Sequence, residues 1–297
     1  MKSLHHLFSV PQGSSGMYWR AALLGALLLV AALLYVAVFT VLYGVARNTE
    51  REFAEAGSEP PLNIYVTFVD MDPVREELLV HLDFATIEGP HGAHYPGVPS
   101  RDMIVHVGDG NSVQDIPLKA QSSAAPVTLR VSLRGSVGNY PLDRYDGRIS
   151  VSTSGTAEEG APQAVRLMVW PVLSNWTVGA ERANLVHATG VDLNLDITRP
   201  SSFVVIAIAV YTAMALVGLS GLTIGGLVFL GIRRIDAALT GTLAAMVFAV
   251  PALRGALPGV PPLGGHADVL VFVWVELAVI LGLTLFVITW ARRGPSP

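Results

Sequence analysis

A short loop contains two histidines whose spacing could hold a metal ion. His91 and His94 stand three residues apart in HGAHY, and two imidazoles at that spacing can share a cation on a helix or tight turn. Glycine and proline surround the pair, and no third ligand is evident nearby. The pattern therefore favours two solvated loop histidines over a metal site, although such a loop could contact a partner.

Glu276 is the second candidate, because its carboxylate interrupts the apolar stretch FVWVELAV. A charged group within hydrocarbon costs at least about 2.5 kcal/mol, so such groups usually pair or face a polar cavity. We expect Arg254 to be its partner, provided that the two flanking helices form a hairpin. A helix-pairing ion pair or a protonated glutamate is favoured over an ion or proton pathway.

No arrangement of side chains resembles a catalytic site. The sequence has no cysteine, which excludes disulfides, thiolate metal sites and a cysteine nucleophile. No nucleophile is accompanied by both a base and a group that orients the base. We therefore expect neither an enzyme nor a bound cofactor. The net charge of -4 gives no indication of a nucleic-acid partner.

The composition indicates an integral membrane protein. Of the 297 residues, 52% are hydrophobic and 14% are charged, whereas a soluble domain carries about 25% charged residues. A membrane-spanning helix needs roughly 20 apolar residues, and four stretches qualify. The first is too long for a cleaved secretory signal and is predicted to be an uncleaved signal anchor. The four predicted spans are 21–46, 201–232, 237–254 and 268–291.

Positive charges predict which way the spans point, because short loops rich in Lys and Arg stay in the cytoplasm. Three clusters flank the spans: Lys2 with Arg20, Arg233 with Arg234, and Arg292 with Arg293. With four spans, all three clusters fall on one side of the membrane. The N-terminal residues 1–20 and the tail 292–297 are then cytoplasmic, while residues 47–200 and the loop 255–267 lie outside.

Residues 47–200 are predicted to form an all-β domain. Short β-branched runs are separated by turn signals, and Leu129, Val131 and Leu133 alternate with polar residues as in a half-buried strand. Seven or eight such strands predict an immunoglobulin-like β-sandwich. The last strand ends at Arg199 and runs almost directly into the second span, so a shift of that strand would pull on the helix.

The sequence resembles a known family without an assigned activity. The stretch from Leu253 to Glu276, LRGALPGVPPLGGHADVLVFVWVE, together with YPLDRYDG, is similar to the bacterial membrane proteins of domain-of-unknown-function family 4436. The resemblance covers nearly the whole chain, including the order of spans. It implies an integral protein of the bacterial plasma membrane, and it carries over no functional residues.

A second resemblance concerns GNYPLDRYDGRI, which is similar to the F-P-F-D signature of pentameric ligand-gated ion channel ectodomains. In those channels the signature loop sits on a linker between two membrane helices. The equivalent linker here contains Arg254, and the resemblance implies that Asp143 or Asp146 reaches it. The chain departs from the channels in having one span before the domain and three after it. The residues implied to couple domain and membrane are Tyr140, Pro141, Asp143, Arg144, Asp146, Arg199 and Arg254.

These observations favour a binding or docking module in the membrane. Its partners are the lipid bilayer and either another protein or further copies of itself. Two alternatives stay open: a ligand-gated-channel-like oligomeric pore, and an accessory subunit of an export or lipid-handling complex. A channel requires a ring of subunits with the third span at its axis, whereas a docking module can be a monomer or a dimer.

Overall fold

The chain divides into two compact units, Met1–Ala46 and Arg47–Pro297. The computed structural model describes only parts of the second unit. The described residues are 51–54, 62–88, 94–96, 99, 102–120, 122, 124–155, 165–183 and 190–293. The predicted first span, 21–46, lies outside them, so it stays a prediction.

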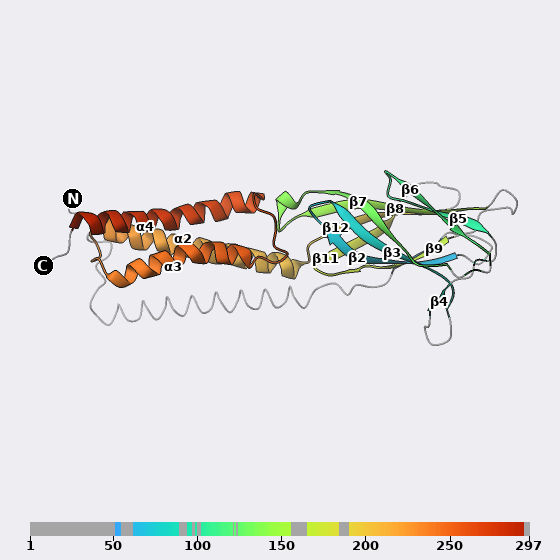
Figure 1. The fold of residues 1–297 in the computed structure, drawn as a ribbon, viewed down its shortest axis with the longest axis horizontal. Coiled ribbons are helices and arrows are strands. Elements are labelled where there is room, and N and C mark those ends of the chain that lie inside the picture. The colour runs from blue at the N-terminus through green and yellow to red at the C-terminus, as the bar shows by residue number, and fades with distance from the viewer. Residues whose placement is uncertain are drawn as a thin grey trace, which may run out of the picture. The chain divides into compact units, whose positions relative to one another are not determined.

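Strands come first along the described chain and helices follow (Figure 1). The strands are β1 (Arg51–Ala54), β2 (Leu62–Asp72), β3 (Glu77–Glu88), β4 (His94–Pro96), β5 (Met103–Gly108), β6 (Val113–Leu118), β7 (Val127–Gly135), β8 (Arg144–Gly155), β9 (Val165–Trp170), β10 (Val172–Leu173), β11 (Trp176–Arg182) and β12 (Gly190–Thr198). A single 3₁₀ turn, η1 (Val137–Asn139), lies between β7 and β8. The helices are α2 (Ser201–Phe229), α3 (Ala237–Gly255) and α4 (Val273–Arg293), and a π-helical turn, η2 (Asp268–Phe272), precedes α4.

The strands form one continuous sheet in the order β1-β9-β2-β3-β7-β8-β12-β11-β10, with β4, β5 and β6 attached at its side. The predicted β architecture is confirmed. The two separate sheets of a sandwich are not, because β7 pairs with β3 through Val131 and with β8 through Leu133. The sheet instead curves until β10 lies against β2, so that it nearly closes like a barrel.

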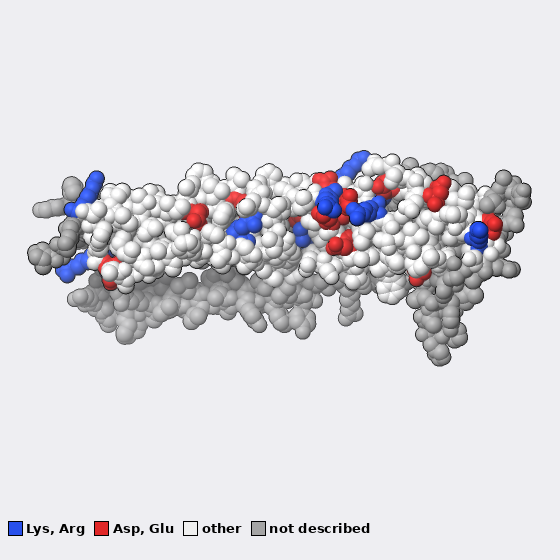
Figure 2. Space-filling model, in the orientation of Figure 1, with Lys and Arg blue, Asp and Glu red and all other residues white. Residues whose placement is uncertain are grey.

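Among the described residues, three helices are long and apolar enough to cross a membrane, in agreement with the predicted second, third and fourth spans. Figure 2 shows few charged side chains over this part of the chain. Helix α2 ends at Phe229 rather than at Ile232, because Gly231 adopts a positive φ of 74° that stops the helix. Trp274 and Trp290 are exposed near the two ends of α4, where aromatic belts of membrane proteins lie.

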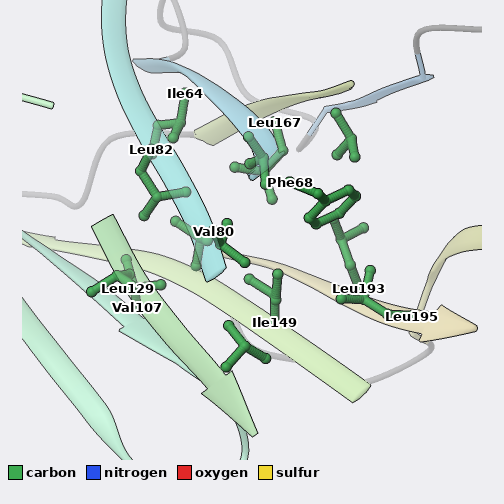
Figure 3. Packing of buried hydrophobic residues seen from close by; sticks show 14 of the residues in the cluster. Ile64, Phe68, Val80, Leu82, Val107, Leu129, Ile149, Leu167, Leu193 and Leu195 are labelled. Carbon is green, nitrogen blue, oxygen red and sulfur yellow. The ribbon is translucent and has the colours of Figure 1, made fainter. Parts of the chain in front are cut away.

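The described part of the β domain has a large apolar core (Figure 3). Ile64, Phe68 and Val80 from one half of the sheet pack in the same cluster as Ile149 and Leu193 from the other half. Each such side chain contributes roughly 1.5–3 kcal/mol when it is fully buried. Because the sequence has no cysteine, this core and its hydrogen bonds stabilise the domain.

Candidate functional site

Three segments meet at the boundary between the β domain and the helices. The first is the turn between β7 and β8, in which Tyr140 precedes a cis Pro141. The second is the connection from β12 to α2, which contains Arg199. The third is the loop between α3 and η2, whose Pro258 carbonyl oxygen accepts a 2.9 Å hydrogen bond from the Tyr140 hydroxyl. We call the side chains that meet here the junction cluster: Tyr140, Asp143, Tyr145, Trp176, Arg199 and Phe203.

A buried ion pair lies at the centre of the junction cluster. The Nε of Arg199 donates to Asp143 Oδ1 at 3.1 Å, and Nη2 donates to Oδ2 at 3.1 Å. The side chains are only 5% and 0% exposed, and the Tyr145 hydroxyl donates to the same carboxylate at 3.4 Å. Two parallel bonds from a guanidinium fix orientation as well as distance. Removing one partner of such a pair leaves an uncompensated buried charge, at a cost of roughly 3–5 kcal/mol.

Aromatic rings enclose the guanidinium of Arg199. Its Cζ lies 3.6 Å from the ring centroid of Trp176, 4.4 Å from that of Phe203 and 5.9 Å from that of Tyr140. Contacts of this kind contribute roughly 0.5–2 kcal/mol each, with the larger values in desolvated sites. Trp176 belongs to β11 and Phe203 to α2, so this one side chain ties the sheet to the first described helix.

The loop after α3 closes the junction cluster from the helical side. Gly259 has a φ of 71°, and a Cβ atom there would lie 3.1 Å from Phe203 Cζ and 3.4 Å from Arg199 Nη1. A larger residue would therefore be strained and would crowd the cluster. Burial raises the pKa of the Tyr140 hydroxyl well above its usual range, so the group that bonds to Pro258 stays protonated at any physiological pH.

Arg254 does not contact the partners that the sequence suggested. Its Nη2 donates to Asp268 Oδ2 at 2.8 Å and to the carbonyl oxygen of Pro261 at 2.8 Å. The Gly264 amide and the Tyr211 hydroxyl also donate to the Asp268 carboxylate. The prediction that Arg254 pairs with Glu276, Asp143 or Asp146 is therefore wrong. Asp268 is the first carboxylate after Arg254 in the sequence, and that proximity was the overlooked signal.

Glu276 remains without a hydrogen-bonding partner in the described part of the chain. Its Oε2 atom is buried, and no donor reaches it. Helix α4 begins only three residues earlier, after the π-helical turn that directs Asp268 to Arg254. The structure thus separates the two acidic groups of this region: Asp268 binds Arg254, and Glu276 lies outside that ion pair.

Arg144 and Asp146 lie outside the junction cluster. Arg144 pairs with Asp196 at 2.7 Å on the surface of the sheet and approaches Asp146 only to 3.9 Å. Both side chains are largely exposed. Alternation along β8 explains this placement, because Tyr145 points into the core and its two neighbours must point outward.

The candidate metal ligands are only partly described. His91 lies outside the described residues, and His94 stands in the short strand β4, where it pairs with Glu88. In the ranges that the structure describes, no group of three His, Cys, Asp or Glu residues is placed to hold a metal ion. A shared cation at His91 and His94 stays an untested prediction.

Two family models match different parts of the chain. Residues 52–197 match the model described as Domain of unknown function (DUF4436), and residues 199–293 match the model described as Domain of unknown function (DUF8686). The similarity to family 4436 therefore covers the strands and not the helices, where the stretch from Leu253 to Glu276 falls in the second match. No curated protein matches the chain.

Proposed function

We propose that this is a four-span protein of the bacterial plasma membrane, with cytoplasmic termini, whose β domain lies outside and docks a partner protein or another envelope component. The observation that carries the proposal is the buried Asp143–Arg199 pair between Trp176 and Phe203. It attaches the β domain to α2 without a flexible linker. A partner bound to the domain would therefore be held at a fixed position over the membrane.

The surface best suited to docking lies on β7, β8, β12 and β11. Two hollows of about 290 and 400 Å³ adjoin there, and both are lined by Asp146 and Gly147. Figure 2 shows basic and acidic side chains gathered in this region. We call this surface the charged face, defined by Arg134, Asp146, Arg148, Glu181 and Asp196. Mixed charges of this kind favour one partner and orientation over others.

Two polar atoms on the charged face lack a hydrogen bond. Arg148 Nε and Asp196 Oδ1 are buried and have no partner within the described residues, although other atoms of these side chains pair with Asp192 and Arg144. Buried polar atoms are nearly always satisfied in native proteins. A docked partner would reach these two buried atoms only if the Arg148 and Asp196 side chains shift on binding.

Site-specific photo-crosslinking in living cells tests the docking proposal. A photoreactive residue is placed at Arg134 or Asp146 on the charged face, with a matched control at Asp70, which is exposed on β2. We expect the two positions on the charged face to give one discrete adduct that is absent from the control. The same adducts at all three positions, or none at the charged face, would contradict docking at this surface.

Two observations favour the channel-like alternative. Helix α3 buries few side chains among the described residues, and Phe248 is 76% exposed. A ring of subunits with α3 at its axis would cover this face, and the contact of Tyr140 with Pro258 matches the domain–linker contact that the resemblance implies. The mass of the particle in nanodiscs, measured by light scattering, distinguishes the two functions. A monomer or dimer that conducts no ions in a planar bilayer excludes the channel.

A further inference from the structure

Large apolar side chains are exposed at the end of the β domain that adjoins the helices. Leu142 is 72% exposed, Val74 is 63% exposed and Val172 is 56% exposed. Single exposed apolar residues are common on soluble proteins and need no explanation. These three are of interest because the chain brings all of them to the junction cluster, although they come from three different turns or edges.

Sequence neighbours and strand register place each of these three residues beside the junction cluster. Leu142 directly precedes Asp143, which holds Arg199 at the start of α2. Val172 pairs with Thr177, and Thr177 pairs with Thr198, the residue before Arg199. Val74 follows Pro73, whose carbonyl oxygen accepts a hydrogen bond from the Tyr145 hydroxyl of the junction cluster.

The loop after α3 adds two more exposed apolar side chains beside the junction cluster. Val260 is 68% exposed and Leu263 is 76% exposed, and their loop contacts Tyr140 through the Pro258 carbonyl oxygen. We call the five residues Val74, Leu142, Val172, Val260 and Leu263 the apolar rim.

The length of α2 shows what the apolar rim faces. Helix α2 has 29 residues, which corresponds to about 44 Å at 1.5 Å per residue. A bilayer measures about 40–45 Å when its headgroup regions are included. With Arg233 and Arg234, just beyond the other end of α2, at one membrane surface, Ser201 lies at the headgroup level of the opposite leaflet. The apolar rim surrounds that level.

We propose that the apolar rim is a lipid-binding surface, inserted into the headgroup region of the leaflet on the side of the β domain. Apolar side chains flanked by a cation are typical of interfacial contacts. Arg75 stands next to Val74, and its exposed guanidinium lies 3.6 Å from the carboxylate of Asp72. The β domain then rests on the bilayer as well as on its own helices. Its orientation responds to the lipids that surround the protein.

Accessibility of spin labels in lipid nanodiscs tests this surface on the full chain. Because the sequence has no cysteine, single substitutions V74C, L142C and V172C each give one labelled site without further changes. The matched control is V113C. Val113 is 69% exposed, but it lies far from the junction cluster. Its cross-strand partner Gly108 pairs with Ser150, which lies six residues along β8 from Arg144 at the junction end of that strand. That separation is about 20 Å of extended strand.

We expect collisions with oxygen, which dissolves in lipid, to exceed collisions with a water-soluble nickel chelate at the three rim positions. The ratio should be several-fold higher there than at V113C, and it should fall when the nanodisc is replaced by a polar amphipol. Rim positions with the same ratio as the control would overturn the proposal. Low accessibility to both reagents would also overturn it, because it would show that another protein surface covers the apolar rim.

Discussion

At the scale of single residues, Asp143 and Arg199 determine how the domain meets the membrane. Neither charge is solvated, since their side chains are 0% and 5% exposed. Each group therefore depends on the other, and on Tyr145 and Trp176, for its stabilisation. The pair resists motion at the junction because any separation of its partners exposes an unpaired charge to an apolar surrounding.

The substitution D143N tests this dependence. The amide keeps the shape of the side chain but leaves the Arg199 cation uncompensated, so we expect a loss of roughly 3–5 kcal/mol in the free energy of unfolding. The change is measured by thermal unfolding of the full chain in detergent. D146N is the matched control, because Asp146 is exposed and reaches Arg144 only at 3.9 Å. Equal losses from both substitutions would contradict the role assigned to Asp143.

Asp109 provides a prediction about pH. Burial of its carboxyl favours the neutral form, but the amides of Ser112, Asn111 and Ser132 donate to it and hold its pKa well below the usual range. A carboxyl whose folded pKa is lowered adds stability above its unfolded pKa of about 3.9, and loses it as the pH falls toward the folded value.

The substitution D109N should therefore lower the melting temperature at neutral pH, since an amide N–H would face the donor of Ser132. The difference from the unmodified chain should shrink as the pH falls through about 4, where Asp109 starts to lose its advantage over the neutral side chain. Melting curves at a series of pH values check this. A difference that is the same at every pH would show that the charge of Asp109 is irrelevant.

At the scale of elements, α2 and α4 pack through glycines. A Cβ atom at Gly225 would overlap the carbonyl oxygen of Gly282, so the two backbones meet directly. Small residues allow such approach and are the usual basis of helix packing in membranes. Helix α3 has no comparable contact among the described residues, which agrees with its more exposed surface.

Alanine substitutions at two adjacent glycines test the packing. G225A forces α2 and α4 apart and should lower thermal stability. G226A should be neutral or slightly stabilising, because its Cβ meets nothing within 4 Å and alanine favours helix by about 1 kcal/mol over glycine. Both substitutions add the same methyl group, so their difference isolates the contact. Equal effects would argue against the α2–α4 contact.

The elements were more predictable from the sequence than their contacts. Alternation of Leu129, Val131 and Leu133 follows from the two-residue period of a strand, so β7 was recognisable. Its pairing with both β3 and β8 was not, because hydrogen bonds between distant strands leave no local pattern. The continuous sheet, in place of a sandwich, follows from that double pairing.

In the junction cluster too, the position of a residue was predictable from the sequence but its contacts were not. Arg199 was expected at the boundary between domain and membrane, and the structure places it there. Its ring partner Trp176 lies 23 residues earlier in the sequence and comes into contact only because Thr177 pairs with Thr198. Asp268 is near Arg254 in the sequence, but the apolar pattern around it does not reveal the π-helical turn that directs its side chain to Arg254.

At the scale of the whole molecule, the proposed topology makes a direct prediction. Val113 is exposed on the β domain, so V113C in intact cells should react with a thiol reagent that cannot cross the membrane. A cysteine at Ser296, in the tail predicted to be cytoplasmic, should react only after the cells are permeabilised. Labelling of S296C but not V113C in intact cells would reverse the proposed orientation.

The contact between Tyr140 and Pro258 has a consequence for biosynthesis. All the described strands and the Asp143–Arg199 pair precede Pro258 in the chain, so a ribosome completes the β domain before it makes the residues that close the junction from the helical side. The junction is finished only after α3 and the loop behind it have been synthesised and inserted. The cell's quality-control proteases would thus meet an open junction in any chain whose last hairpin fails to enter the membrane.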